Sequence, residues 1–404
     1  MRVLMVSDVY FPRINGVSTS IETFRTALSR VGVSVRLVVP RYGVEGSTDE
    51  ITRVPGAAVP GDPEDRIAGW NAMHRAVEEA SRGCDLIHVQ TPFVAQYASL
   101  AAGRALGLPV LATYHTLFEE YLHHYAPFVP SSWLRRLARF VSARQCNALD
   151  GVIVPSSAMR DRLSAYGVRA PLHILPTGIP LQRFAGGRGA AFRVRYGIPP
   201  GRPVALYVGR VAHEKNIGFL IDAVSVARLA VPDVLLLITG EGPARSSLER
   251  AVESRGLGAN VRFLGYLDRA SELPDCYAAA DVFAFASRTE TQGLVLLEAM
   301  AAGLPVIALS AMGTADILDA GRGCIVAPDD ASAFGAALAD YLREHSSVSS
   351  LLRAQARELA TEWSDHVMAD RLAQVYRAYA GSTGGRGVLR VQGGLRSSRT
   401  AAHP

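Results

Sequence analysis

The stretch that decides the fold is VFAFASRTETQGLVLLEAMAAGLPVIAL, which occupies residues 282–309. It opens with a short apolar run at Val282–Ala286, crosses a polar loop, and continues into a predicted helix at Leu294–Ala302. A second apolar run follows at Pro305–Leu309. Two buried strands joined by a helix form a βαβ unit, whose strands are parallel and whose connection is right-handed. The stretch therefore predicts a parallel sheet with helices packed on it.

The same alternation of short apolar runs and longer amphipathic segments extends over most of the chain. Each run is continuously apolar, as expected of strands that are buried on both faces. The runs are Val3–Ser7, Val33–Val39, Leu86–Gln90, Val110–Tyr114, Gly151–Pro155 and Leu172–Leu175, then Val204–Val208, Val234–Thr239, Val261–Leu264, Val282–Ala286, Pro305–Leu309 and Cys324–Ala327. The two successive sets predict an α/β protein with two Rossmann-like, doubly wound domains that face each other across a cleft.

A stretch rich in proline and glycine, residues 176–201, separates the two sets of strands. After the second set, one more amphipathic segment precedes a region in which glycine, serine and arginine dominate without periodicity. The predicted segments are an N-terminal domain over 1–176, a linker over 177–201, a C-terminal domain over 202–364, a helix over 365–380 that crosses back to the N-terminal domain, and a disordered basic tail over 381–404.

The composition is that of an ordinary globular protein. Hydrophobic residues make up 49% and charged residues 20% of the 404 residues, which is enough to build two cores. The formal net charge of +5 favours anionic partners, which include phosphates, an anionic membrane surface and nucleic acid. The charge alone does not choose among them.

Three absences in the sequence predict a cytoplasmic protein. The N-terminus enters a strand at once, without the apolar segment of a signal peptide. The sequence contains no run of about 18 apolar residues, the length that a helix needs to span a bilayer. The cysteines are scattered without a C-x-x-C pair, which suits reduced thiols rather than disulfides or structural zinc. These cysteines are Cys84, Cys146, Cys276 and Cys324.

Two glutamates flank the start of the helix within residues 282–309. Glu290 lies in the loop and Glu298 lies in the helix, with seven residues between them. The helix N-terminus offers unpaired N–H groups and about half a positive charge, which suits a diphosphate, and Gly293 lets the backbone approach it. A carboxylate such as Glu298 can accept two hydroxyls, as in the vicinal pair of a ribose. In isolation, two glutamates on a solvated helix face would be the simpler interpretation.

The stretch from Glu290 to Val306 strongly resembles the E-x7-E signature of glycosyltransferase family 4, and other blocks resemble the family up to about residue 379. The resemblance implies the two-domain GT-B fold and retention of anomeric configuration. It also implies that Glu298 binds the ribose, and Glu290 the transferred sugar, of a nucleotide-sugar donor. Backbone contacts to the donor phosphates are implied for Gln292, Gly293 and Leu294.

A second block, GRVAHEKN at residues 209–216, follows the apolar run Val204–Val208. Arg210 and Lys215 project from a short loop at a strand end, where two cations can hold a leaving diphosphate. The block resembles the family's G-R-x-x-x-x-K element, whose arginine and lysine have this role; two solvated surface cations are the alternative. Asn216 is predicted to cap the following helix with its side chain.

Two further residues stand out in the N-terminal half. Gly16 follows the first predicted strand, ahead of a helix with a predicted capping box of Thr19 and Glu22. By resemblance, Gly16 approaches the donor phosphates and the acceptor; otherwise it is a turn residue. His115 ends the run Val110–Tyr114, and the resemblance places it beside the reacting sugar; otherwise it is a structural histidine.

No metal or cofactor is predicted. The sequence contains no D-x-D triplet and no cluster of His, Asp and Glu with metal-ligand spacing. We therefore expect Arg210, Lys215 and the helix N-terminus to meet the charge of the leaving diphosphate. The motifs place no carboxylate as a covalent nucleophile of the kind used by retaining glycosidases. This favours front-face attack through an oxocarbenium-like state.

The segment SSWLRRLARFVSAR, residues 131–144, predicts an amphipathic basic helix. Its apolar face consists of Trp133, Leu134, Leu137, Phe140 and Val141, and its arginines off that face are Arg135, Arg136, Arg139 and Arg144. This pattern is typical of a helix that lies on an anionic membrane. The alternative is a helix packed into the core with a solvated basic side. The predicted membrane-surface residues are Trp133, Arg135, Arg136, Arg139 and Phe140.

The preceding segment, Ala112–Tyr125, resembles bacterial diacylglycerol glucosyltransferases. These are monotopic members of the family that use UDP-glucose. The resemblance favours UDP-glucose as the donor and a lipid such as diacylglycerol as the acceptor. It also favours a peripheral position on the inner face of the cell membrane.

Three other functions fit part of the sequence. A mannosyl- or glucosyltransferase of the same type could act on a soluble or polysaccharide acceptor. An NAD-dependent oxidoreductase would need G-x-G-x-x-G after a first strand, but the run that begins at Gly240 has Arg245 where the third glycine belongs. A nucleotide- or nucleic-acid-binding protein without catalysis would fit the charge, but no basic patch interleaved with aromatics supports nucleic acid as a partner.

Overall fold

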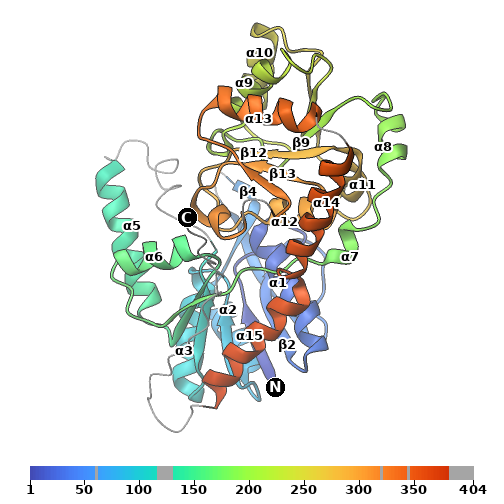
Figure 1. The fold of residues 1–404 in the computed structure, drawn as a ribbon. Coiled ribbons are helices and arrows are strands. Elements are labelled where there is room, and N and C mark those ends of the chain that lie inside the picture. The colour runs from blue at the N-terminus through green and yellow to red at the C-terminus, as the bar shows by residue number, and fades with distance from the viewer. Residues whose placement is uncertain (60–61, 116–130, 319–321, 344–345, 382–404) are drawn as a thin grey trace, which may run out of the picture.

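The computed structural model describes residues 1–59, 62–115, 131–318, 322–343 and 346–381. It contains two sheets, each covered by helices, with the N-terminal sheet below the C-terminal one in Figure 1. The prediction of two Rossmann-like α/β domains is confirmed.

The N-terminal sheet has the strand order β4-β3-β2-β1-β5-β6-β7-β8 and is parallel except for the pair β3 and β4. Its strands are β1 (Arg2–Val6), β2 (Ser34–Arg41), β3 (Ile51–Val59), β4 (Asp62–Ala68), β5 (Leu86–Val89), β6 (Val110–Thr113), β7 (Gly151–Val154) and β8 (Leu172–Ile174). Alternate residues of β1 enter different cores, because Val3 and Met5 pack with helices on one face and Leu4 and Val6 with helices on the other. Burial on both faces explains the continuous apolar runs.

The strands β3 and β4 were not predicted from the sequence. Their segment contains prolines and glycines that indicate turns, including Pro55 and Gly56. The first half of β3 pairs with β2 and its second half with β4, so each half is hydrogen-bonded on one side. Proline is tolerated where a strand has a free side, since its missing N–H breaks no ladder there.

The C-terminal sheet is parallel, in the order β11-β10-β9-β12-β13-β14. Its strands are β9 (Val204–Val208), β10 (Leu235–Thr239), β11 (Val261–Gly265), β12 (Val282–Phe285), β13 (Val306–Ala308) and β14 (Cys324–Val326). Each lies on a predicted run. The order places β9 and β12 side by side at the centre of the sheet, so the loops that follow these two strands emerge together.

The helices complete both layers. Those of the N-terminal half are α1 (Gly16–Arg30), α2 (Trp70–Ser81), α3 (Val94–Leu106), α5 (Ser131–Cys146) and α6 (Ser157–Ala165). The others are α7 (Leu181–Phe184), α8 (Gly189–Arg195), α9 (Ile217–Ala227), α10 (Arg245–Ser254), α11 (Glu272–Ala279), α12 (Leu294–Ala301), α13 (Ala331–Arg343), α14 (Ser346–Thr361) and α15 (Asp365–Ala380), with 3-10 turns η1 (His213–Lys215) and η2 (Met312–Asp316).

The chain crosses between the two domains twice, at neighbouring points. Ile179 N donates to Trp363 O at 3.0 Å, and Asp365 N donates to Ile179 O at 2.9 Å. Beyond the second crossing, α15 packs on the core of the N-terminal domain, and the Tyr376 hydroxyl lies 2.6 Å from His88 Nδ1. In Figure 1, α14 and α15 run along one side of the molecule from the upper domain to the lower one.

The glycines between the domains are explained by close packing. A Cβ atom at Gly187 would lie 2.2 Å from Pro274 O, and one at Gly189 would lie 2.2 Å from Ala278 O. Both partners belong to α11, so the segment that carries α8 is fastened to the C-terminal domain. The tail from residue 382 onward, predicted to be disordered, lies outside the described residues.

The predicted capping box of α1 is wrong. The helix begins at Gly16 with Asn15 as its N-cap, whose side chain accepts from Ser18 N at 2.9 Å, and Ser18 Oγ in turn accepts from Asn15 N. Glu22 instead pairs with Arg25 within the helix. The true box lies four residues earlier because asparagine and serine cap a helix as well as threonine does.

Candidate active site

The loops that follow β9 and β12 bring Lys215 and Glu290 together. Lys215 Nζ donates to Glu290 Oε1 at 2.6 Å, and the two side chains are only 17% and 18% exposed. The residues are 75 positions apart in the sequence, and they meet because their strands are neighbours. The carboxyl edge of a parallel sheet is where ligands bind in open α/β folds. An ion pair at this edge is therefore a candidate catalytic element.

The backbone around Glu290 is held in place by η2. Gly313 N donates to Glu290 O at 2.9 Å. A Cβ atom at Gly313 would lie 2.1 Å from Thr291 O, so only glycine lets the two segments approach this closely. The loop that carries Glu290 thus has a fixed path before any ligand binds, which is the preorganisation that electrostatic catalysis requires.

The start of α12 has the geometry of an anion site. Gly293 adopts the left-handed conformation with φ +99°, which turns the loop into the helix. The first N–H groups of a helix have no partner within it. The Gln292 side chain is engaged elsewhere, since its Oε1 accepts from Thr177 N at 2.8 Å and its Nε2 donates to Thr177 O at 2.7 Å. Only the main chain of Gln292 is left to serve a phosphate.

Glu298 lies within α12 and is 3% exposed. Arg269 donates to its Oε1, and the Tyr277 hydroxyl donates to its Oε2 at 2.9 Å. Burial and the neighbouring carboxylate raise the pKa of Tyr277 well above its usual value, so the hydroxyl keeps its proton. Both carboxylate oxygens of Glu298 thus have protein partners.

Arg210 is separate from the Lys215–Glu290 pair. Its side chain is 59% exposed, and its guanidinium lies 3.5 Å from the carboxylate of Glu214. Asn216, predicted to cap α9 with its side chain, does not do so: it is left-handed with φ 56°, and its Nδ2 donates to Ala286 O at 3.0 Å. Asn216 therefore ties η1 to the end of β12, which fixes the loop that carries Lys215.

The N-terminal wall of the site contains His115. Its Nε2 lies 3.0 Å from Gln90 Oε1, at the ends of the neighbouring strands β5 and β6. Burial lowers the pKa of His115 to about 4 from 6.5, so the ring is neutral at pH 7. Thr291 Oγ1 donates to the His115 carbonyl at 3.2 Å, which brings the loop of Glu290 against this wall.

Gly16 stands at the first position of α1 without a structural requirement for glycine. Its φ is not in the left-handed region, and a Cβ atom there would meet nothing within 4 Å. The simple turn interpretation therefore has no steric basis, and the space in front of Gly16 is open to a ligand.

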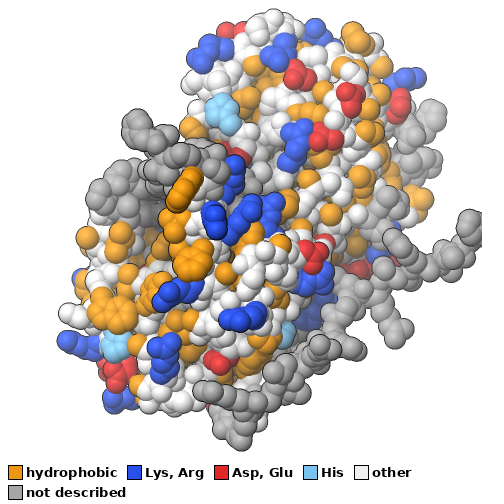
Figure 2. All heavy atoms as spheres, turned by 90° about the vertical axis from the view of Figure 1, so that its left-hand side faces the viewer, with side chains coloured by type: hydrophobic (Ala, Val, Ile, Leu, Met, Phe, Trp, Pro, Cys, Tyr) orange, Lys and Arg blue, Asp and Glu red, His pale blue; other side chains and the backbone are white. Residues whose placement is uncertain are grey.

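The helix α5 exposes its large apolar side chains. Trp133 is 74%, Phe140 63% and Leu137 57% exposed, whereas Ala138 and Cys146 are buried against the domain. The core-packed alternative is thus wrong for Trp133, Leu137 and Phe140, because the smaller Ala138 and Cys146 form the packing face. Figure 2 shows hydrophobic side chains beside basic ones on the face that carries α5. Exposed residues on this helix include Arg135, Arg136 and Arg139.

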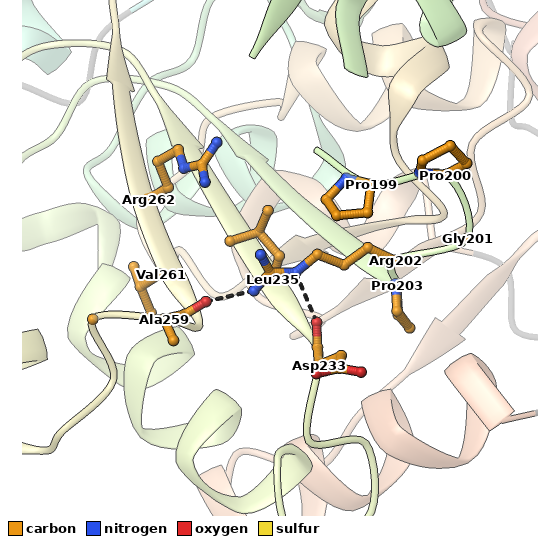
Figure 3. A pocket seen from close by; sticks show the side chains of 11 residues that line it. Pro199, Pro200, Gly201, Arg202, Pro203, Asp233, Leu235, Ala259, Val261 and Arg262 are labelled. Carbon is orange, nitrogen blue, oxygen red and sulfur yellow. Dashed lines mark hydrogen bonds between the residues drawn. The ribbon is translucent and has the colours of Figure 1, made fainter. Parts of the chain in front are cut away.

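A larger pocket lies away from these residues. It has a volume of about 610 Å³ and is lined by residues just before β9, β10 and β11, at the opposite edge of the C-terminal sheet (Figure 3). Arg202 donates to Asp233 O at 3.0 Å and to Ala259 O at 2.5 Å across it. Arg202 thus holds the loops before β10 and β11 together, and we do not assign the active site to this pocket.

Neither a membrane span nor a metal cluster is found in the part of the chain that the structure describes. No helix there is long and apolar enough to cross a bilayer. No three His, Cys, Asp or Glu side chains in those ranges converge to hold a metal ion.

Comparison with known proteins identifies the chain. A model of Glycosyltransferase Family 4 matches residues 14–183, and one of Glycosyl transferases group 1 matches residues 190–363. The alpha-monoglucosyldiacylglycerol synthase of Streptococcus pneumoniae is 34% identical over an alignment that covers 76% of this chain and 71% of that protein. The protein is a family 4 glycosyltransferase.

Other relatives of this glycosyltransferase are named for other activities. A GDP-mannose-dependent alpha-mannosyltransferase of Mycobacterium tuberculosis is 30% identical over 81% of the chain and 84% of that protein. Among solved structures, HepE of Anabaena in complex with UDP-glucose superposes with a TM-score of 0.72 at 17% identity, over 94% of this chain and all of that one. Sucrose-phosphate synthase from Thermosynechococcus elongatus gives 0.75 at 23% identity, over 93% and 98%. The glycosyltransferase has the GT-B fold.

The sequence missed Arg269 and Tyr277, which hold Glu298 in the glycosyltransferase. Arg269 lies in the loop after β11, so its place at a strand's carboxyl end was a usable signal. Tyr277 gave no signal, because a tyrosine on the apolar side of a helix is most simply a core residue. Of the segment that resembles diacylglycerol glucosyltransferases, residues 116–125 lie outside the described ranges.

Proposed function

We propose that the protein is a retaining hexosyltransferase that moves glucose from UDP-glucose to a hydroxyl of a membrane lipid such as diacylglycerol. The observation that carries the proposal is the Lys215–Glu290 ion pair in front of the N-terminus of α12. An anionic leaving group and a polyhydroxylated sugar would each find a partner there. The lipid is favoured by the relatives from S. pneumoniae and Acholeplasma laidlawii, both named alpha-monoglucosyldiacylglycerol synthase.

In this proposal the donor lies along the C-terminal wall. The backbone of Gln292, Gly293 and Leu294 meets the diphosphate at the start of α12, where the helix dipole favours negative charge. Lys215 adds a cation that is already fixed by Glu290. Arg210, whose side chain is exposed, closes on the phosphates from the rim. Glu298 takes the ribose, and Glu290 takes hydroxyls of the transferred sugar.

The proposed reaction proceeds on one face of the sugar. The bond from the anomeric carbon to the phosphate oxygen breaks, and a bond from that carbon to the acceptor oxygen forms on the same side. The acceptor proton passes to the departing phosphate oxygen, so the nucleoside diphosphate leaves and configuration is retained. Fixed cations and helix N–H groups stabilise the charge that develops on the diphosphate. No metal is needed in this proposal.

His115 serves the proposed reaction as a neutral hydrogen-bonding group. Its lowered pKa of about 4 prevents it from acting as a cation at pH 7. The contact with Gln90 fixes the orientation of its ring. Gly16 gives the acceptor and the phosphates room to approach from the start of α1.

The lipid acceptor is proposed to reach the site from a membrane on which α5 lies. Trp133 and Phe140 insert between lipids, and Arg135, Arg136 and Arg139 contact anionic headgroups. The exposed aromatic rings of Phe93 (55%), just before α3, and Tyr97 (51%), on α3, extend this surface. They lie beside α5 because Gln145 near its end bonds to Pro92 O and to the Tyr97 hydroxyl. The protein would then be peripheral on the inner face of the membrane.

A second function has support from the comparisons. The M. tuberculosis relatives include a GDP-mannose-dependent alpha-mannosyltransferase and a glycogen synthase that is 30% identical over 94% of this chain and 95% of that protein. The alternative is therefore a mannosyl- or glucosyltransferase with a soluble or polysaccharide acceptor.

Release of nucleoside diphosphate by the purified protein tests the proposal. A panel of UDP- and GDP-sugars is supplied with and without diacylglycerol in mixed micelles, and with a chelator in a parallel arm. Glu298→Ala is expected to lose activity, and Glu253→Ala, on the exposed face of α10, serves as the matched control. Lipid-stimulated, chelator-resistant release from UDP-glucose supports the proposal. Release that does not depend on lipid favours a soluble glycan as the acceptor. Absence of release from every donor contradicts the enzyme function.

A further inference from the structure

The carboxylate of Glu298 is closed off in the unliganded protein. Its side chain is 4% exposed, with Arg269 on one oxygen and Tyr277 on the other. The adjoining cavity touches both Arg269 and Glu298 and has a volume of only about 10 Å³. That volume is about the minimum for one water molecule. A ribose ring cannot reach Glu298 until a neighbouring group moves.

Arg269 is the neighbour that can move. Tyr277 is 1% exposed and its ring packs against Phe184 and Phe283, with centroids 5.8 Å and 5.9 Å away. The Arg269 side chain is 30% exposed and projects from the loop between β11 and α11.

The backbone of that loop has its own support. Asp268 accepts hydrogen bonds from Ala270 N at 3.1 Å, from Ser271 N at 2.9 Å and from Ser271 Oγ at 2.6 Å. These bonds form a turn around Arg269 that does not depend on Glu298. The arginine can therefore leave the carboxylate by side-chain rotation, while the loop keeps its path.

We propose that Arg269 is a gate residue, whose guanidinium occupies the ribose position on Glu298 and is displaced when the nucleotide binds. The inference rests on the proposed nucleotide-sugar donor and deepens it. Two ribose hydroxyls replace the guanidinium as donors to Glu298, and Tyr277 keeps the carboxylate oriented throughout. The freed guanidinium then faces the cleft, where the anionic donor lies.

The gate lowers the measured affinity for nucleotides. Only the fraction of molecules whose Arg269 has left Glu298 can bind the ribose, and the apparent dissociation constant rises by the inverse of that fraction. Removing the guanidinium abolishes this competition. A nucleotide without ribose hydroxyls gains nothing from an uncovered Glu298.

The test is calorimetric titration of UDP, and of its 2′,3′-dideoxy analogue, into wild type and Arg269→Gln. The gate predicts that the preference for UDP over the analogue rises by about tenfold in the variant. Arg195→Gln is the matched control, since it removes one charge that pairs at 2.7 Å with Glu272 on α11, and it should leave the preference unchanged. Arg269→Lys is expected to fall between, and it replaces the glutamine variant if that one unfolds.

Three results would overturn the gate in different ways. A smaller preference for UDP in Arg269→Gln would make Arg269 a residue that positions Glu298 for the ribose. An equal change for both nucleotides would assign Arg269 a long-range charge effect only. Failure of the wild type to bind UDP or GDP would contradict the donor itself, and so would remove the proposed function together with the gate.

Discussion

The two walls of the cleft handle charge in opposite ways. On the C-terminal wall the charged side chains form ion pairs, with Lys215 against Glu290 and Arg269 against Glu298. On the N-terminal wall burial pushes such groups toward their neutral forms. It lowers the pKa of His115 to about 4, and elsewhere in the same domain it lowers the pKa of His88 to about 3 and raises that of Asp8 to about 6.

The contrast follows from what each wall must bind in the proposed reaction. A diphosphate carries charge that grows as the bond to the sugar breaks, so fixed opposite charges are useful on the C-terminal wall. The proposed acceptor is a neutral hydroxyl on an apolar molecule, and unpaired charges near it would only have to be desolvated. In the proposed reaction, ions on one wall serve the donor and neutral groups on the other serve the acceptor.

The largest effect should come from removing the buried cation of the C-terminal wall. Lys215→Ala is expected to lower kcat by about 100-fold, as loss of a preorganised charge contact usually does. Arg210→Ala is expected to cost about tenfold, because its exposed side chain must first be ordered. Nucleoside diphosphate release measures both. Equal losses in the two variants would show that burial is not what distinguishes these cations.

The apolar surface of α5 should have the next largest effect. Replacing Trp133 and Phe140 by serine is expected to weaken binding to anionic vesicles by at least about tenfold, since each ring contributes about 1.5–3 kcal/mol when buried. Vesicle sedimentation at low salt measures this. The matched control replaces Val194 and Leu229, which are 81% and 80% exposed on the C-terminal domain. If the control loses as much binding, α5 is not the membrane surface.

A smaller effect is expected where the two walls are joined. Asp316 of η2 accepts from Ser157 N at 2.6 Å and from Ser157 Oγ at 2.5 Å, at the start of α6 in the other domain. Asp316→Asn should lower the free energy of unfolding by about 1–3 kcal/mol and raise the KM for the donor a few-fold.

The control for that contact lies within one domain. Asp330 accepts from Ala333 N at 2.8 Å at the start of α13, so Asp330→Asn should affect stability but not KM. Urea unfolding and donor titration measure the two quantities. An unchanged KM in Asp316→Asn would show that the contact does not couple the walls.

The smallest expected effect concerns the pH dependence of stability. Asp8 accepts from Thr91 Oγ1 and Ala95 N at the start of α3, and its pKa of about 6 exceeds the ordinary 3.8. Between these values the folded protein binds more protons than the unfolded chain, so this carboxyl makes stability fall as pH rises from about 4 to about 6.

Asp8→Asn should remove that fall. Urea unfolding measures the change in the free energy of unfolding between pH 5 and pH 7. This change is expected to differ between wild type and variant by about 1 kcal/mol. His88 and His115, whose pKa values are lowered, contribute the opposite slope, but they are present in both proteins. Identical pH profiles would mean that the pKa of Asp8 is not raised in the folded protein, and would weaken the contrast between the walls.

Much of the fold could be predicted from the sequence because strands buried on both faces leave continuous apolar runs. Every predicted run is a strand. The hairpin of β3 and β4 was not predicted, because Pro55 and Gly56 in the sequence indicate a turn. Only the structure shows that each half of β3 pairs on one side, where these residues are tolerated. The cap at Asn216 was wrong because its side chain found a better partner in Ala286 O, 70 residues away.

The sequence by itself determined the family and singled out Glu290 and Glu298 as candidate site residues, because E-x7-E is a local pattern on one loop and one helix. Tertiary structure alone decided what those residues touch. Strand order brought Lys215 to Glu290, and the loop after β11 brought Arg269 to Glu298. It also decided which face of α5 is exposed, since Ala138 and Cys146 pack inward and Trp133, Leu137 and Phe140 do not. A periodic pattern marks a face of a helix, but only the neighbouring elements determine what covers it.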